Sequence, residues 1–500
     1  MAKQLQSIAI QAPGFYGLNT EDSPTALTEQ FALEATNCVI DNFGRIGSRK
    51  GYQYVTETNP DNIMFMSEFI KADGTSEIVS ASDTAIYTGT ATLTDITPVG
   101  YTVTDGFYDA ATLSNKHYLY RKGAKPLVYD GTTMTAVEDH PNVSGTVIEA
   151  NIVNSAYGRL WIANSDTEET TIYWSDLLDG LTWDSGSAGY IDVSKVWAGG
   201  ADTIEGIAAH NGFLVIFGRT QILVYQGAED PATMSLADTI VGIGCMCRDS
   251  IQKTGNDLIF LSDTGVRSLN RTIQEKSIPI SDLSKNIRTN LNSYVSNIQG
   301  KRSVSIYSPE EAFYLLHLPD AGLTYCFDTR TPLQDGSYRA TVWNSVNPNG
   351  MLRTREGKLY LGKQVGIAEY TGYTDNGAQY VMSYFTNYLD FGAPSNLKLL
   401  KNLKITVIGG SATDVTLNWG YDYSYAYKKR RFTLTTQLIA EYNIAEYNEG
   451  EFNAGVLVNR PNVNASGGGA VIQVGIEAEV NGSPVSIQRM TAQATIGRTI

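Results

Sequence analysis

The sequence predicts an all-β protein that consists of a β-propeller of six or seven blades and a β-sandwich-like C-terminal module. Its 500 residues include 47 Gly and 30 Tyr, and only 18% are charged, a composition that favours strands and tight turns. A unit of two apolar strands around a polar turn recurs roughly every 40 residues, as propeller blades require. Beyond Gly372 the repeat stops and longer strands begin. A chain of this length allows roughly three domains.

The clearest copy of the repeat covers residues 204–227. Its centre is Asn211-Gly212, a strong signal for a two-residue hairpin turn between strands. An array of β-sandwiches also shows short alternating strands and is the alternative to the propeller. We assign 61–374 to the propeller because six weaker copies flank the clear one, over residues 77–89, 117–131, 149–176, 249–270, 302–328 and 350–372.

Residues 1–60 lack the repeat and are rich in Thr, Asn and Gly. We expect an N-terminal arm that packs on another part of the structure. Residues 375–500 contain longer alternating strands, including 403–408 and 415–419, and a second two-residue turn at Asn481-Gly482. This pattern predicts a β-sandwich-like domain.

One inserted helix is expected near residues 282–298. Ser281 is a suitable cap, and apolar residues follow at steps of three and four on one helical face. These residues are Leu283, Ile287, Leu291, Val295 and Ile298.

The net charge of −15 argues against binding of the whole surface to nucleic acid or anionic lipid. The first residues lack the apolar region of a signal peptide, and no stretch reaches the roughly 18 apolar residues of a membrane span. We therefore expect no membrane insertion by the chain's own sequence. Four cysteines are too few for a disulfide framework.

The sequence contains no recognisable enzyme signature. Gly242-Ile243-Gly244 leads into Cys245 and Cys247 and not into a Lys-Ser or Lys-Thr helix, so it is not a phosphate loop. The two cysteines are separated by one residue, and no His or Cys cluster lies nearby in sequence to complete a zinc site. The histidines, at positions 117, 140, 210 and 317, lie in separate units. We expect no enzyme activity, cofactor or metal.

Residues 175–183, Ser-Asp-Leu-Leu-Asp-Gly-Leu-Thr-Trp, resemble the Asp-box of sialidases. The Asp-box places one residue between its Asp and Gly, whereas Asp179 and Gly180 are adjacent here. The motif is structural even in sialidases. Sialidase chemistry would also need an arginine triad and a Tyr nucleophile, which this sequence does not identify.

One segment near the C-terminus is a possible assembly contact. Its tyrosines recur at period two, which predicts that they line one face of a strand, and four cations follow them. The surface could bind an acidic partner or nucleic acid, or it could be an exposed hairpin with solvated cations. The residues are Tyr421, Tyr423, Tyr425, Tyr427, Lys428, Lys429, Arg430 and Arg431.

The order of these parts resembles the tail nozzle proteins of short-tailed bacteriophages, also called tail tubular or tail accessory proteins. The N-terminal phrase of that family is similar to residues 14–19, 35–37 and 41–51 of this chain, which include Gly17-Leu-Asn19 and Arg45-Ile-Gly47. Its blade hairpins are similar to residues 157–161, 172–176 and 207–225. The helix after Ser281 also lies where such proteins carry one.

This resemblance implies a structural virion protein of the tail, made in the host bacterial cytoplasm. It implies a homohexameric ring that extends the DNA ejection channel below the portal and an adaptor ring protein. A distal needle, plug or fibre protein would attach to it, and duplex DNA would pass through without specific binding. The alternatives are a carbohydrate-binding or carbohydrate-cleaving propeller of a receptor-binding tail component, and a generic protein-interaction propeller.

Overall fold

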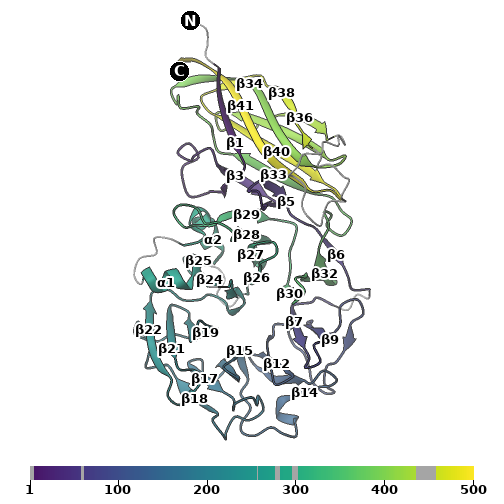
Figure 1. Cartoon of the computed structure of the whole chain (residues 1–500), viewed down its shortest axis with the longest axis vertical. Helices are drawn as coiled ribbons and strands as arrows, with labels where there is room; N and C mark the ends of the chain where they lie inside the picture. Colours follow the sequence, from purple (N-terminus) through teal and green to yellow (C-terminus); the bar gives the residue numbers. More distant parts are fainter. Residues whose placement is uncertain are drawn as a thin grey trace.

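The protein, a computed structural model, consists of a ring of small β-sheets and an elongated β-sandwich at one side of the ring (Figure 1). The structure describes residues 5–57, 61–255, 257–275, 282–295, 302–434 and 458–499. The fold is all-β, as the sequence predicts.

The first four blades are separate four-stranded antiparallel sheets, each with its first strand innermost. The first blade comprises β7 (Phe65–Ile70), β8 (Ser76–Ala81), β9 (Ile86–Thr88) and β10 (Thr94–Asp95). The second comprises β11 (Asp109–Leu113), β12 (Lys116–Arg121), β13 (Ala124–Tyr129) and β14 (Met134–Ala136). The third comprises β15 (Ala150–Ala156), β16 (Arg159–Ser165), β17 (Thr171–Trp174) and β18 (Gly189–Asp192). The fourth comprises β19 (Ile204–His210), β20 (Phe213–Gly218), β21 (Gln221–Gln226) and β22 (Ser235–Val241).

Three further sectors complete the ring. The fifth blade has three strands, β23 (Gln252–Lys253), β24 (Leu258–Ser262) and β25 (Gly265–Ser268). The sixth position holds β26 (Val304–Ser308), β27 (Phe313–Leu318), β28 (Leu323–Asp328) and β29 (Arg339–Trp343), which belong to a larger sheet. The seventh sector contains β30 (Gly350–Arg353), β31 (Leu359–Lys363), β32 (Gly366–Tyr370) and the N-terminal strand β6 (Tyr52–Tyr54).

The prediction of six or seven blades is confirmed. In the described part of the chain six blades are separate sheets, and β26–β29 fill the remaining position within the sheet that continues into the sandwich. Because β6 pairs with β32, a strand from near the N-terminus completes the last blade and closes the ring.

Local sequence explains the blade hairpins. Asn211 and Gly212 between β19 and β20 both have positive φ angles, 49° and 81°, as a type I′ turn requires. Tyr157 and Gly158 between β15 and β16 do the same, with φ angles of 53° and 71°. The apolar faces of adjoining blades then pack against each other. Trp161 and Trp174 of the third blade share one such cluster with Ile207 and Leu214 of the fourth.

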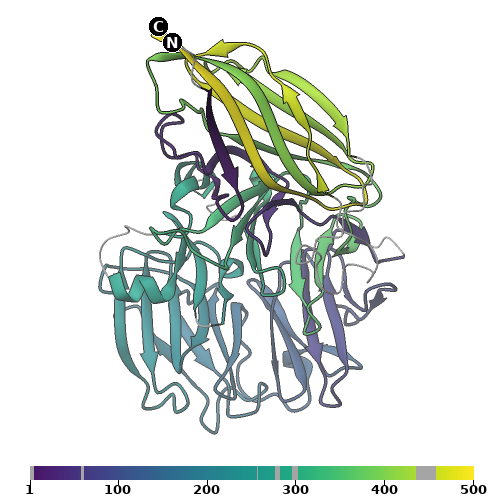
Figure 2. The same cartoon turned by 45° about the horizontal axis from the view of Figure 1, so that its top comes forward.

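The C-terminal strands form the two layers of the sandwich, which enclose an apolar core (Figure 2). The eight-stranded layer contains β1 (Leu5–Gln11), β4 (Cys38–Ile40), β5 (Ile46–Ser48), β34 (Asn396–Gly409), β37 (Val458–Asn459), β38 (Asn462–Asn464), β39 (Gly468–Gly469) and β41 (Val485–Thr499). The other layer contains β2 (Gly17–Leu18), β3 (Phe31–Thr36), β33 (Tyr380–Thr386), β35 (Asp414–Tyr421), β36 (Lys428–Thr433) and β40 (Ile472–Val480).

The second layer is continuous with the propeller. Strand β29 of the sixth position pairs with β2 and β3, β3 pairs with β33, and the sheet continues through β40 and β35 to β36. Residues 5–54 therefore contribute strands to both layers of the sandwich and to the last blade. The ten-stranded sheet fixes the sandwich to the ring by backbone hydrogen bonds.

The helical content differs from the sequence expectation. The helix expected over 282–298 corresponds to a 3₁₀ turn, Lys285–Ile287, followed by α2 (Arg288–Val295), in which Leu291 and Val295 are buried. Ser281 and Ile298 lie outside the described residues. A second helix, α1 (Leu269–Glu275), was not predicted, because its apolar residues Leu269 and Ile273 are too few to show helical periodicity. Three short 3₁₀ turns, Val137–Asp139, Arg248–Ser250 and Pro319–Ala321, lie elsewhere in the described residues.

Arg49 lies where the N-terminal segment, the propeller and the sandwich meet. Its guanidinium group is fully buried and donates two hydrogen bonds to the carboxylate of Asp375, with N–O distances of 2.8 and 2.7 Å. It also lies 4.0 Å from the ring centroid of Tyr380 in β33. The asparagine between β3 and β4, Asn37, accepts a hydrogen bond from Nε of the same arginine. A charge without its partner would be costly at this depth.

We predict that Arg49→Met lowers the free energy of unfolding by about 3–5 kcal/mol, because it leaves the Asp375 carboxylate buried without its partner. Chemical denaturation followed by tryptophan fluorescence measures the loss. Arg353→Met is the matched control, since the Arg353–Glu310 ion pair is partly exposed and should contribute about 1 kcal/mol or less. Equal effects of the two substitutions would contradict the role assigned to Arg49.

Candidate functional site

The predicted contact segment forms a hairpin at the edge of the sandwich. Strand β35 ends at Tyr421 and β36 begins at Lys428, so the expectation that all four tyrosines line one strand face is wrong. Asp422 and Tyr423 adopt left-handed backbone, with φ angles of 51° and 61°, and this turn ends the strand alternation. The Asp422 carboxylate accepts a hydrogen bond from the backbone N–H of Val471, at 3.2 Å, which fixes the turn.

The tyrosines of the hairpin have different environments. Tyr423 and Tyr425 are 52% and 86% exposed, and the ring of Tyr423 lies 4.5 Å from that of Tyr388. Tyr421 and Tyr427 are half-buried and donate hydrogen bonds to the Ser466 carbonyl and the Gln473 side chain. Only the tip of the hairpin therefore presents open aromatic surface.

The four cations of the hairpin are all exposed, but two of them have carboxylate partners in the same sheet. Arg431 pairs with Asp414 and Glu479, at 2.6 and 3.0 Å, and Lys429 lies 3.5 Å from Glu477. Lys428 donates to the Ser466 carbonyl, and Arg430 lies against the ring of Phe432. The structure thus leaves Lys428 and Arg430 as the cations most available to a partner.

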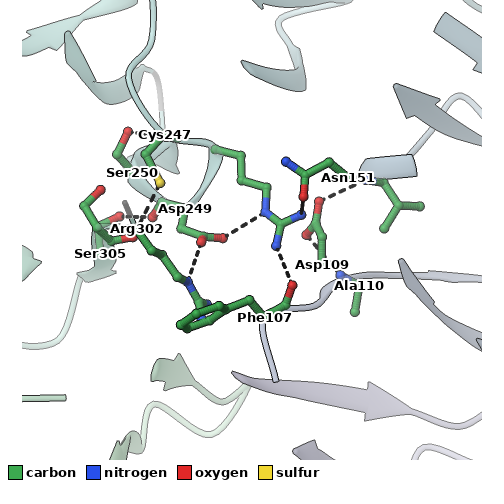
Figure 3. Close-up of polar contacts among 12 residues, drawn as sticks. Phe107, Asp109, Ala110, Asn151, Cys247, Asp249, Ser250, Arg302 and Ser305 are labelled. Atoms are coloured by element: carbon green, nitrogen blue, oxygen red, sulfur yellow. Dashed lines mark hydrogen bonds and ion pairs between the residues drawn. The ribbon is translucent and has the colours of Figure 1, made fainter. Parts of the chain in front are cut away.

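A second polar cluster, which we call the axial network, connects several blades of the propeller (Figure 3). Arg248 donates to the Asn151 side chain and to the Phe107 carbonyl, at 2.9 and 3.2 Å, and its Nε lies 3.4 Å from Asp249. Arg302 donates to the other oxygen of Asp249, at 2.7 Å, and to the carbonyl oxygen preceding β7, while its guanidinium covers the Phe107 ring. The network therefore connects residues at the starts of β7, β11, β15, β23 and β26.

A cavity of about 310 Å³ adjoins this network. Residues of β11, β15, β19 and β23 line it, and its polar lining includes Asp109, Asn154 and Lys253. The side-chain oxygen of Asn154 is buried without a hydrogen-bond partner among the described residues. Arg248 and Asp249 also line this cavity, so the network and the cavity adjoin each other directly.

Burial raises the pKa of Asp109 to about 6, although the charge of Arg248 and hydrogen bonds from the backbone N–H groups of Val153 and Ala110 oppose the rise. Burial also acts to raise the pKa of Asp249, but Arg302 and Arg248 outweigh it and the pKa is lowered. The cluster has no nucleophile hydrogen-bonded to a base. Its ion pairs and hydrogen bonds connect several blades and stabilise their packing.

The histidines and cysteines are dispersed. His117 is buried between Ser67 and Thr112, and burial lowers its pKa to about 4. His317 is buried beside Thr324, and burial likewise lowers its pKa to about 4. All four cysteines are buried free thiols. Among the described residues, no group of three or more His, Cys, Asp or Glu side chains is placed to hold a metal ion. None of the helices described there is long and apolar enough to cross a membrane.

The Asp-box-like segment, residues 175–183, lies in the loop between β17 and β18, which internal hydrogen bonds hold in place. Asp179 accepts hydrogen bonds from the Leu181 backbone and the Thr182 hydroxyl, at 3.0 and 2.8 Å. Asp184 is exposed and accepts one from Ser144. These carboxylates hold the loop together instead of converging on a pocket.

The axial network was not predicted from the sequence. Its members are single polar residues without a shared motif. Spacing was the one signal that could have indicated the network. Met64, Phe107 and Asn151 recur about one blade apart, at or just before the start of an innermost strand.

We predict that Asp109→Asn removes part of the pH dependence of stability. Because the pKa of Asp109 is about 6 in the folded state and near 4 when unfolded, its folded form binds the proton more tightly. The contribution of Asp109 to the free energy of unfolding therefore falls as the pH rises from about 4 to 6, and it is constant above pH 6. Between pH 5 and 7.5, wild type should lose about 1.4 kcal/mol more than the variant in chemical denaturation. Asp184→Asn, an exposed control, should match wild type, and an equal loss in D109N would contradict the prediction.

Solved structures similar to this chain include propellers of several kinds. The WD40 β-propeller domain of Doa1 has a TM-score of 0.39 and 10% identity, and the alignment covers 64% of this chain and 96% of that one. YCF48 bound to a D1 peptide has a TM-score of 0.39 and 11% identity, with coverage of 65% and 98%. The Neurospora crassa Pan2 WD40 domain has a TM-score of 0.36 and 9% identity, with coverage of 65% and 95%. No curated protein matches the chain.

Residues 104–334 match the model of a protein family described as Phage_stabilise, the β-propeller of bacteriophage P22 Gp10. The match spans β11 to β28, and thus the second to fifth blades with most of the sixth position. Over these residues, which are somewhat less than half of the chain, the protein is similar to the propeller of a phage protein.

Proposed function

We propose that this protein is the nozzle of a short phage tail, a homohexameric ring that continues the DNA ejection channel below the portal and adaptor. The match of residues 104–334 to the phage P22 Gp10 propeller carries this proposal. An adaptor or portal-side ring protein is the partner on one side. A needle, plug or fibre protein is the partner on the other.

The arrangement of the two modules supports a ring-forming role. A shared ten-stranded sheet and the buried Arg49–Asp375 pair hold propeller and sandwich in one orientation. A subunit of fixed shape can make the same head-to-tail contact with each neighbour. Such contacts close into a ring when their rotation fits.

The charge of the chain supports passage of DNA without binding. Each chain carries −15, so six copies would carry −90. A channel wall that is neutral to acidic repels phosphates and lets duplex DNA slide.

We predict that native mass spectrometry of the purified protein, alone or with its adaptor, shows hexamers. In about 0.1 M salt the ring should bind duplex DNA no better than an unrelated acidic protein of similar charge, because counterion release favours only cationic surfaces. A monomer under every assembly condition would reject the ring. Tight DNA binding that weakens with salt would reject the repulsive channel.

We propose the hairpin tip as an assembly contact of this ring or its neighbours. Tyr423 and Tyr425 supply open aromatic surface, and Lys428 and Arg430 supply charge without a carboxylate partner in the described residues. Aromatic side chains and arginine are enriched at protein interfaces.

We predict that replacing Tyr425, Lys428 and Arg430 together with Ser weakens assembly in a salt-dependent way while the unfolding midpoint stays unchanged. Analytical ultracentrifugation at low and high salt measures the assembly. Replacing Lys429 and Arg431 with Ser is the matched control, because those cations already pair within the sheet. Unchanged assembly of the triple variant at low salt would leave the segment as a solvated hairpin.

A further inference from the structure

The loop between β17 and β18 exposes two adjacent leucines. Leu177 and Leu178 are 53% and 63% exposed, although each has a large apolar side chain. The third blade, which carries them, lies on the side of the propeller away from the sandwich (Figure 1). We name this pair of leucines the leucine knob.

The leucine knob is held rigidly. The backbone N–H of Leu178 donates to the Gly158 carbonyl at 2.7 Å, and its own carbonyl accepts a hydrogen bond from Ser114 of the neighbouring blade. Asp176, on the other side, accepts hydrogen bonds from the backbone and hydroxyl of Ser187, at 2.8 and 2.7 Å. The loop is therefore clamped to two other turns and loses little freedom when a partner binds.

The backbone of the knob is strained. Leu178 has a φ of 57°, a left-handed conformation that is an outlier for a bulky side chain, whereas Asn or Gly would adopt it readily. Such strain persists where the surroundings impose it and is concentrated at binding sites. Leu178 is 63% exposed, so burial of its side chain does not account for a leucine at this strained position.

The surroundings of the knob are acidic. Residues 61–250, which include the first four blades, hold 25 acidic and nine basic side chains, a net charge of −16, while the rest of the chain sums to +1. Asp184 in the same loop is exposed, as is Glu229, whose charge acts on Tyr157 beside the knob. A nucleic acid or an anionic lipid surface would be repelled here. Aliphatic side chains also do not offer the flat aromatic rings on which bases stack.

We propose that the leucine knob anchors a second tail protein, one that presents an apolar pocket rimmed by lysine or arginine. The exposed leucines would fill the pocket and the acidic loops would meet its rim, since interfaces combine a buried apolar centre with complementary charge. The proposal rests on the location in a phage tail that the family match supports and does not require a hexameric ring.

The test uses virions assembled with the double variant Leu177→Ser, Leu178→Asn. Asn tolerates the left-handed backbone, so the loop keeps its shape while the apolar surface is lost. Quantitative mass spectrometry of purified tails should show at least a tenfold drop of one other tail protein relative to this chain. Glu229→Lys should lower the same protein severalfold at low salt, because it places a cation against a basic rim.

Two controls separate apolar anchoring from damage to the fold. Leu177→Met with Leu178→Met keeps an apolar knob and should retain the partner, and Leu236→Ser removes another leucine, 42% exposed on β22, and should have no effect. A photo-crosslinking amino acid at position 177 should join this chain to the tail protein that is lost. Unchanged tail composition, or a crosslink only to another copy of this chain, would overturn the proposal. Native mass spectrometry of the double variant reports ring formation separately, so failure of the proposed nozzle role would be distinguishable.

Discussion

The buried guanidinium of Arg49 is the interaction on which the joint between the two modules depends. It follows β5 of the sandwich, pairs with Asp375 between β32 and β33, and lies against Tyr380 of the sandwich and near Trp343 of the sixth position. A charge at this depth is tolerated only when its donors are satisfied. Hydrogen bonds to Asp375, Asn37, Ser345 and the Lys50 carbonyl satisfy them. The three segments are thereby held in one geometry.

The N-terminal segment extends this constraint to the whole molecule. One short stretch supplies strands to each layer of the sandwich and then β6 to the last blade. A main apolar cluster also runs without interruption from Ile259 and Leu291 at the propeller to Leu403 and Ile476 in the sandwich. Since backbone pairing and core packing both cross the joint, we infer that propeller and sandwich move as one body.

The polar features fall into two physical kinds. The axial network and the Asp-box-like loop satisfy their own charges internally, so they stabilise blades and leave little for chemistry. The hairpin tip and the leucine knob expose aromatic or apolar surface on rigid turns. They lie at opposite ends of a molecule whose negative charge is concentrated in the first four blades.

Sequence alone determined the all-β class, the recurring blade unit and individual turns such as Asn211-Gly212, because strand alternation and turn chemistry are local. It did not determine the contacts that connect the propeller to the sandwich, nor the conformation of the hairpin between β35 and β36. The partner of Arg49 is 326 residues away, and β29 pairs with β2 and β3 across a similar separation, so no local period reports them. Likewise the period-two tyrosines predicted a strand, but Asp422 turns the chain because its carboxylate is held by the distant backbone of Val471. Long-range packing decides such contacts, and only the tertiary structure contains it.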